Sequence, residues 1–193
     1  SKFLAFKSKL MFWFQKSNLP SRSKKNVEHH YDLSPELYKL FLDVDQQYSC
    51  AFFQKEDDSL EQAQINKKQH IAKKLLLEPG MTVLDIGCGW GGLSLSLAKH
   101  YDVNVLGITL SEEQRLIAEA RAIREGLQDK VNFKILDYRT DCGTFDRIVS
   151  VGMFEHVGTR NYIDYFEAIR NKLNENGIAL IHTIGRMCSP GNN

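Results

Sequence analysis

The stretch Val83-Leu84-Asp85-Ile86-Gly87-Cys88-Gly89-Trp90-Gly91-Gly92 decides the fold. An apolar run ends in a carboxylate, breaks into glycines and continues into a helical pattern from Leu93 to His100. This order predicts a strand, a tight turn and the start of a helix. Glycines let a backbone approach a ligand closely, and the first N–H groups of a helix are unpaired. We therefore expect a nucleotide-like cofactor at residues 83–92.

The same stretch indicates which cofactor is bound. Three glycines match the G-x-G-x-x-G pattern of dinucleotide sites, namely Gly87, Gly89 and Gly92. However, Asp85 would repel a pyrophosphate, whereas it would tolerate the cationic sulfonium and amino group of S-adenosylmethionine. The next predicted strand ends in Thr109-Leu110-Ser111, without the acid that a dinucleotide ribose requires. These features favour S-adenosylmethionine over a nicotinamide cofactor. A glycine turn that only packs a helix against a strand is the alternative.

Hydrophobic periodicity beyond Met81 predicts alternating strands and helices. Before it we expect helices over 1–16, 35–43 and 59–77, with a linker over 17–28 and irregular structure over 44–57. The predicted strands are 81–86, 103–108, 131–136, 145–151 and 177–184. The predicted helices between them are 91–100, 111–126 and 160–174. Such alternation is typical of a doubly wound, mainly parallel α/β sheet.

Composition indicates a globular protein of one main domain. The chain has 193 residues, of which 42% are hydrophobic and 25% charged. No apolar run is long enough to span a bilayer, and no secretory signal is recognisable. The four cysteines are scattered without C-x-x-C spacing. This pattern disfavours a disulfide framework or a zinc site and fits a reducing cytosol, so we expect no metal.

Charge is concentrated at the N-terminus. Residues 1–25 carry seven cationic side chains and no acid, so the rest of the chain has a formal net charge of −6 against a total of +1. Aromatic and aliphatic residues are interleaved with these cations. We predict a basic amphipathic segment over 1–26 that lies on an anionic membrane surface, followed by a catalytic domain over 27–193. A helix docked on another domain is an equal alternative, whereas the acidic remainder disfavours nucleic acid.

An ordered set of motifs resembles the cyclopropane-fatty-acyl-phospholipid synthases, a family that includes mycolic acid cyclopropane synthases. The resemblance runs from about Val27 to Gly185. Its blocks are His30-Tyr31-Asp32-Leu33-Ser34, Tyr48-Ser49-Cys50-Ala51-Phe52-Phe53, residues 84–92, Gly107-Ile108-Thr109-Leu110-Ser111 with Gln114, Asp137-Tyr138-Arg139, residues 146–158 and His182-Thr183-Ile184-Gly185. The Asp137-Tyr138-Arg139 form is more similar to the bacterial phospholipid enzymes.

The resemblance implies a class I S-adenosylmethionine-dependent methyltransferase fold and a specific reaction. A methyl group passes from S-adenosylmethionine to the cis double bond of a phospholipid acyl chain. A bound bicarbonate then removes a proton and the cyclopropane ring closes. An alkene is a poor nucleophile, so positioning must supply much of the rate, and the cation must be shielded from water. The expected location is cytoplasmic, at the inner face of the membrane, and both a monomer and a homodimer stay open.

The resemblance also assigns residues. It places the cofactor at His30, Tyr48, Ser49, Asp85, Gly87, Gly89, Thr109, Gln114, Asp137 and Tyr138. Within this set Asp85 is expected to face the methionine amino group and Asp137 the adenine. Bicarbonate is expected at the catalytic positions Cys50, Glu155, His182 and Ile184. His156, next to Glu155, is interpreted as structural. A solvated Glu155 and a packed His182 are the ordinary alternatives.

Two other functions stay open at this point. One is a methyltransferase of the same fold that acts on another lipid or on a small molecule. The other is a truncated, non-catalytic domain that binds cofactor, since a methyltransferase sheet normally continues with further strands after 177–184. The combination of Tyr48-Ser49-Cys50 with Glu155 and His182 favours cyclopropane formation, because a simple transfer to oxygen or nitrogen would not need it.

Overall fold

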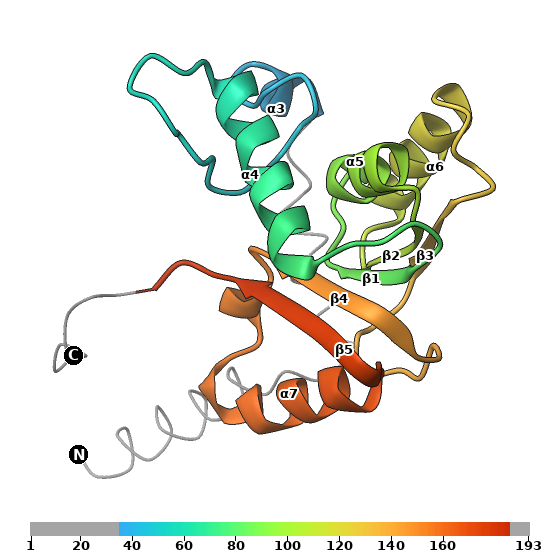
Figure 1. Ribbon diagram of the computed structural model, residues 1–193. Coiled ribbons are helices and arrows are strands. Elements are labelled where there is room, and N and C mark those ends of the chain that lie inside the picture. Colours follow the sequence, from blue (N-terminus) through green and yellow to red (C-terminus); the bar gives the residue numbers. More distant parts are fainter. Residues whose placement is uncertain (1–34, 186–193) are drawn as a thin grey trace, which may run out of the picture.

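The computed structural model describes residues 35–185 (Figure 1). The predicted helix over 1–16, the linker over 17–28, the domain boundary after residue 26 and the cofactor residue His30 lie outside the described residues. No helix within 35–185 is long and apolar enough to cross a membrane.

A parallel sheet forms the centre of the molecule. Its five strands lie in the order β3-β2-β1-β4-β5, and each neighbouring pair is parallel. The strands are β1 (Thr82–Ile86), β2 (Asn104–Thr109), β3 (Val131–Ile135), β4 (Phe145–Val151) and β5 (Leu173–His182). The strand order reverses between β1 and β4, and ligands of open α/β sheets bind at the carboxyl ends of strands at such a point. The predicted parallel α/β sheet is confirmed.

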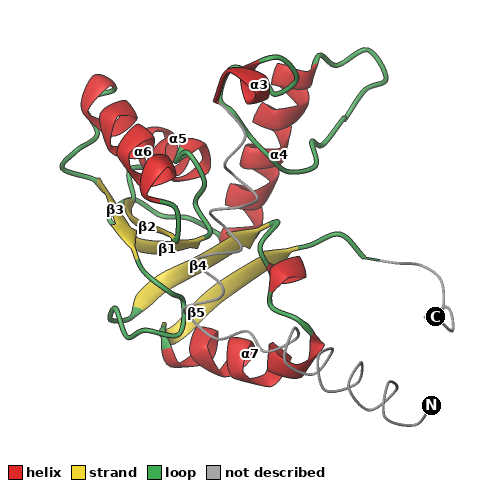
Figure 2. Ribbon diagram, turned by 180° about the vertical axis from the view of Figure 1, so that it is seen from behind, coloured by secondary structure: helices red, strands yellow, loops and turns green. Residues whose placement is uncertain are grey.

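Helices cover both faces of this sheet, as the two opposite views show (Figures 1 and 2). On one face lie α4 (Leu60–Leu75), α5 (Gly92–Tyr101) and α6 (Glu112–Arg124), and on the other lies α7 (Tyr162–Asn171). The remaining helical segments are α3 (Pro35–Lys39), η1 (Phe154–His156) and η2 (Thr159–Asn161).

Strand alternation separates the buried side chains into two cores. Val83 and Val149 pack with the face covered by α4, α5 and α6, whereas Leu84 and Ile148 pack with the face covered by α7. Serine caps start two of the helices as expected: Ser59 Oγ accepts from the Gln62 N–H at 3.2 Å, and Ser111 Oγ accepts from the Gln114 N–H at 3.3 Å.

The structure differs from the sequence prediction by more than two residues at two places. The first helix ends at Lys39, whereas the prediction extended it to residue 43. Helix α7 ends at Asn171 and β5 begins at Leu173, whereas the prediction had a helix to 174 and a strand from 177. Leu173 already pairs with Phe145 in β4, and the register then shifts before Ile178 pairs with Arg147. Asn176, at φ 64°, lies in this irregular stretch.

Candidate functional site

The carboxyl end of β1 places a buried acid at the centre of the molecule. Asp85 is 1% exposed, and its Oδ2 accepts a hydrogen bond from Ser94 Oγ at 2.6 Å. Burial raises the pKa of Asp85 to about 6, and the bond from Ser94 opposes the rise. The turn after it therefore begins beside a carboxyl group that changes charge near pH 6.

The glycine-rich turn is held by main-chain bonds and by close packing. The N–H groups of Gly87 and Cys88 both donate to the Ile108 carbonyl, at 2.9 and 3.0 Å. Gly91 has φ 82°, and a Cβ there would lie 2.7 Å from a ring carbon of Phe133. At Gly89, with φ 55°, a Cβ would meet no protein atom within 4 Å. Gly91 is thus required for packing, whereas Gly89 adjoins open space.

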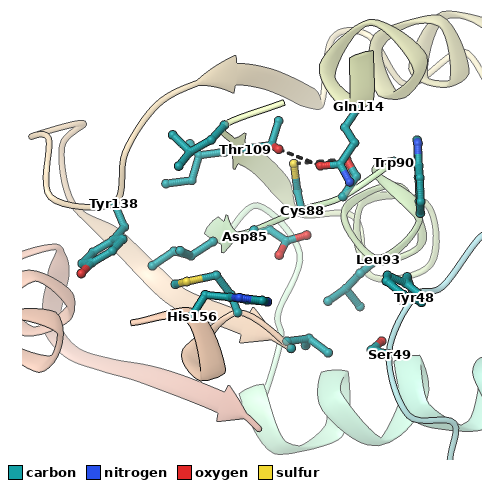
Figure 3. Close-up of a pocket in the computed structure, with 18 of the residues that line it drawn as sticks. Tyr48, Ser49, Asp85, Cys88, Trp90, Leu93, Thr109, Gln114, Tyr138 and His156 are labelled. Carbon is teal, nitrogen blue, oxygen red and sulfur yellow. Dashed lines mark hydrogen bonds between the residues drawn. The ribbon is translucent and has the colours of Figure 1, made fainter. Parts of the chain in front are cut away.

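The end of β2 contributes a neutral hydrogen-bonding pair in place of an acid. Thr109 Oγ1 donates to Gln114 Oε1 at 2.9 Å, and the N–H of Ser111 donates to Thr109 Oγ1 at 3.2 Å. Thr109 and Gln114 are both buried. Figure 3 shows this pair beside Cys88.

The loop after β3 supplies Asp137 and Tyr138. Asp137 Oδ1 accepts from the N–H and the Nε of Arg139, at 2.9 and 2.7 Å. Burial alone would raise the pKa of Asp137, but these bonds hold it below its usual value. The Tyr138 ring packs edge-on against Tyr165, with centroids 5.1 Å apart. The Tyr138 hydroxyl is buried and has no hydrogen-bond partner among residues 35–185.

These elements line a pocket of about 240 Å³ that opens at the carboxyl edge of the sheet. In Figure 3, Tyr138 and Tyr48 lie on opposite sides of it, with Asp85 between them. Nine of the cofactor residues assigned from sequence line the pocket: Tyr48, Ser49, Asp85, Gly87, Gly89, Thr109, Gln114, Asp137 and Tyr138. Four segments that are distant in the sequence are therefore brought to one place.

The four predicted bicarbonate residues do not line this pocket. Glu155 and Ile184 nevertheless meet, because the Ile184 N–H donates to Glu155 Oε1 at 2.7 Å. Burial of the Glu155 carboxyl would raise its pKa, but the bond from Ile184 and further hydrogen bonds keep it below its usual value. His182 ends β5, and its Nδ1 is buried without a hydrogen-bond partner in the described part of the chain. Cys50 is exposed directly after Ser49.

Sequence reasoning did not predict several residues at the pocket. His156, interpreted as structural, lines it together with Met153, and a Cβ at Gly87 would lie 3.1 Å from Met153. The only sequence signal for His156 is its position just after a predicted strand. Gln46 and Gln47 also line the pocket, from a segment with no regular pattern. Within 35–185, no group of three or more His, Cys, Asp or Glu side chains could hold a metal ion.

Comparison with protein families gives a match over residues 19–192 to the mycolic acid cyclopropane synthetase family. The chain belongs to this family. The chain is also similar to the cyclopropane-fatty-acyl-phospholipid synthase of Escherichia coli K12, with 50% identity over 170 residues, covering 87% of this chain and 43% of that protein. A probable fatty acid methyltransferase of Pseudomonas putida is 48% identical over 160 residues, covering 82% of this chain and 41% of that protein.

A solved structure of the family has the same fold. The crystal structure of the mycolic acid cyclopropane synthase CmaA1, complexed with SAH and CTAB, has a TM-score of 0.79 and 39% identity, covering 82% of this chain and 55% of that one. The chain thus spans about half the length of the family members it matches. The resemblance inferred from the motifs is confirmed.

Proposed function

We propose that this chain belongs to an enzyme that converts cis double bonds of unsaturated phospholipid acyl chains into cyclopropane rings, with S-adenosylmethionine as the one-carbon donor. The observation that carries the proposal is the pocket at the β1/β4 switch point, which is lined by nine of the residues that the resemblance to cyclopropane synthases assigns to the cofactor. The family match and the SAH complex of CmaA1 support the same cofactor.

The residues of the pocket fit S-adenosylmethionine. Asp85 offers a carboxylate to the cationic methionine end, and Gly89 leaves space that a Cβ would fill. Thr109 and Gln114 offer neutral hydrogen-bonding groups where a dinucleotide site would carry an acid. Tyr138 adds an aromatic side chain to the same lining.

In the proposed reaction, the methyl group leaves sulfur as an electrophile and bonds to one alkene carbon, while the S–C electron pair stays on the S-adenosylhomocysteine. One proton then leaves the new methyl group, and its C–H electron pair closes the three-membered ring. The protein must orient the double bond and exclude water that would trap the cation. The apolar pocket residues Ile86, Leu93 and Met153 fit that role.

We further propose that Glu155, His182, the backbone at Ile184 and the Cys50 region surround bicarbonate, which supplies a base for the departing proton. The bond between Ile184 and Glu155 and the unpaired His182 Nδ1 support this assignment. The loops that carry Cys50 and Glu155 are also neighbours, since a Cβ at Gly152 would lie 3.8 Å from Ser49 Cβ. An ionised Glu155 that accepts hydrogen bonds can orient a small acid–base group.

The membrane surface is the proposed place of action, in the cytoplasm at the inner face of the membrane. The phospholipid named for the Escherichia coli family member and the basic, aromatic composition of residues 1–25 support it.

Glu155→Gln tests the proposed chemistry. We expect this variant to bind S-adenosylmethionine like the unsubstituted chain and to lose ring formation on unsaturated phospholipid vesicles, measured by mass spectrometry of the acyl chains. Glu175→Gln, an exposed acid in β5, is the control and should keep the full yield. An unchanged cyclopropane yield with Glu155→Gln would remove Glu155 from the mechanism. If the unsubstituted chain and both variants all yield no cyclopropane, the proposed reaction is refuted for this chain.

A further inference from the structure

One wall of the pocket is built from a segment without helix or strand, which we call the wall segment (residues 43–49). Four consecutive residues of it, Gln46 to Ser49, line the pocket. Gln46 has φ 55°, a backbone conformation that residues other than glycine rarely adopt. Such a segment keeps its shape only where surrounding contacts hold it.

Nearly buried polar side chains of α4 hold the wall segment from one side. Gln64 Nε2 donates to the carbonyls of Gln47 and Ser49, at 3.2 and 3.0 Å. Lys67 Nζ donates to Ser49 Oγ at 2.7 Å. Gln64 and Lys67 are each 3% exposed. Gln and Lys side chains are rarely buried unless they make hydrogen bonds. We therefore take the role of these two side chains of α4 to be the support of the wall segment.

Arg121 of α6 holds the same segment from the other side and joins it to the glycine-rich turn. Its Nη1 donates to the carbonyl of Trp90 at 2.9 Å and to the carbonyl of Asp45 at 3.2 Å. Its Nη2 pairs with the Asp45 carboxylate. Trp90 and the wall segment both line the pocket, and Arg121 itself does not. One guanidinium thus fixes the spacing between two walls of the site.

The last glycine of the motif has a role in the same contact. A Cβ at Gly92 would lie 2.7 Å from Asp45 Oδ2 and closer still to Gln47 Nε2. Gly92 does not have a positive φ, so a side chain there would displace the ends of the Asp45 and Gln47 side chains without straining the backbone. The third glycine of the pattern that suggested a dinucleotide turn therefore makes room for Asp45 and Gln47.

We infer that Arg121 is a positioning residue for the cofactor pocket, acting through Asp45 and the Trp90 carbonyl to hold the wall segment against the glycine-rich turn. The buried face of helix α6 then contributes two residues to the site: Gln114, which lines the pocket, and Arg121, two turns later, which supports its wall. This inference rests on the proposed function for the identity of the ligand only.

The test compares Arg121→Met with Arg115→Met in the 193-residue chain. Arg115 lies on the same helix and pairs at the surface with Glu112 and Glu119, away from the pocket. S-adenosylhomocysteine affinity is measured by calorimetry well below the unfolding temperature, and amide hydrogen exchange reports on residues 43–50. We expect Arg121→Met to weaken binding about ten-fold and to speed exchange in the wall segment, because the pocket is no longer preorganised. Arg115→Met should change neither.

Two further variants keep the test decisive if Arg121→Met folds poorly. Arg121→Lys keeps a cation beside Asp45, but a single ammonium group cannot bond Asp45 and the Trp90 carbonyl as the guanidinium does. Its affinity should therefore lie between those of Arg121→Met and the unsubstituted chain. Gly92→Ala leaves Arg121 in place and displaces Asp45, so it should loosen the wall segment as well. Unchanged affinity and exchange in Arg121→Met and Gly92→Ala, or equal losses with Arg115→Met, would overturn the inference. If the unsubstituted chain binds no S-adenosylhomocysteine, the cofactor proposal fails, and exchange in residues 43–50 still decides the inference.

Discussion

At the scale of single residues, Asp85 determines what kind of ligand the glycine-rich turn can accept. Its carboxyl group is almost fully buried and accepts a hydrogen bond from Ser94, and the positive charge of Lys67 acts on it only through space. Its neutral form is therefore favoured by burial, and a cationic ligand would favour its ionised form. The same residue that disfavours a pyrophosphate thus couples ligand binding to proton release.

Binding of S-adenosylmethionine should accordingly depend on pH. Because the pKa of Asp85 is raised to about 6, the carboxyl is largely neutral at pH 5 and largely ionised at pH 7. We expect affinity to rise about ten-fold between these pH values if the cation binds only the ionised form. Asp85→Asn should bind weakly at both and show no such rise. Calorimetric titrations across this range check it, and a flat profile for the unsubstituted chain would contradict the role of Asp85.

Gly89 allows a second residue-scale test with a close control. Gly89 and Gly126 both have positive φ, and a Cβ at either would meet no protein atom within 4 Å, but only Gly89 lines the pocket. Valine at each position should cost similar stability, about 1–2 kcal/mol, because of the left-handed backbone. Gly89→Val should also abolish S-adenosylmethionine binding, whereas Gly126→Val should keep it. Equal affinities in the two variants would show that the turn at Gly89 is not the ligand site.

At the scale of elements, the strands and the helices between them could be predicted, because each has its own hydrophobic periodicity and is bounded by capping or turn residues. Ser111 caps α6, and the apolar residues of β1 lead directly into the glycine-rich turn, both of which are local signals. The boundary between α7 and β5 could not be predicted, because Leu173 becomes extended through its pairing with Phe145, a contact that no local pattern encodes. Residues 44–49 of the wall segment were rightly expected to be irregular. The long-range hydrogen bonds that they receive from Gln64 and Arg121 could not be predicted, because such bonds produce no periodic pattern in the sequence.

The candidate site could likewise be predicted only in part. Thr109 and Tyr138 could be placed at the pocket from the motifs that resemble the cyclopropane synthases, and both lie at or after the carboxyl ends of strands, where ligands of such sheets bind. His156 was missed, because its place at the pocket depends on the short helix η1, which follows β4 without a helical pattern in the sequence. Sequence reasoning about a lone histidine cannot distinguish such a turn from a packed core position.

The junction between α4 and the sheet is an element-scale feature that can be tested by stability. Arg147 of β4 is 9% exposed, and its guanidinium donates to the carbonyl of Leu76 at 3.2 Å and to the carbonyl of Leu75, at the end of α4. Arg147→Met should lower the free energy of unfolding by about 2 kcal/mol, since the Leu75 and Leu76 carbonyls lose a charged donor. Arg124→Met, exposed on α6, should change it little. Urea denaturation compares them, and equal midpoints would contradict this role for Arg147.

At the scale of the whole molecule, the parallel sheet brings the glycine-rich turn, the wall segment and the loops after β3 and β4 around one pocket, while Glu155, His182 and Ile184 lie at the neighbouring ends of β4 and β5. This arrangement suits a reaction in which one region holds the methyl donor and an adjacent one receives a proton. The account therefore predicts the transfer of a methylene unit, since the donated methyl group loses one of its hydrogens.

Isotope transfer measures this directly. Vesicles of cis-unsaturated phospholipid are incubated with the protein, bicarbonate and S-adenosylmethionine that carries a trideuterated methyl group, and the acyl chains are analysed by mass spectrometry. The account predicts cyclopropane rings that retain two of the three deuterons. Acyl chains that gain a methyl group with all three deuterons, or that gain no label, would contradict it.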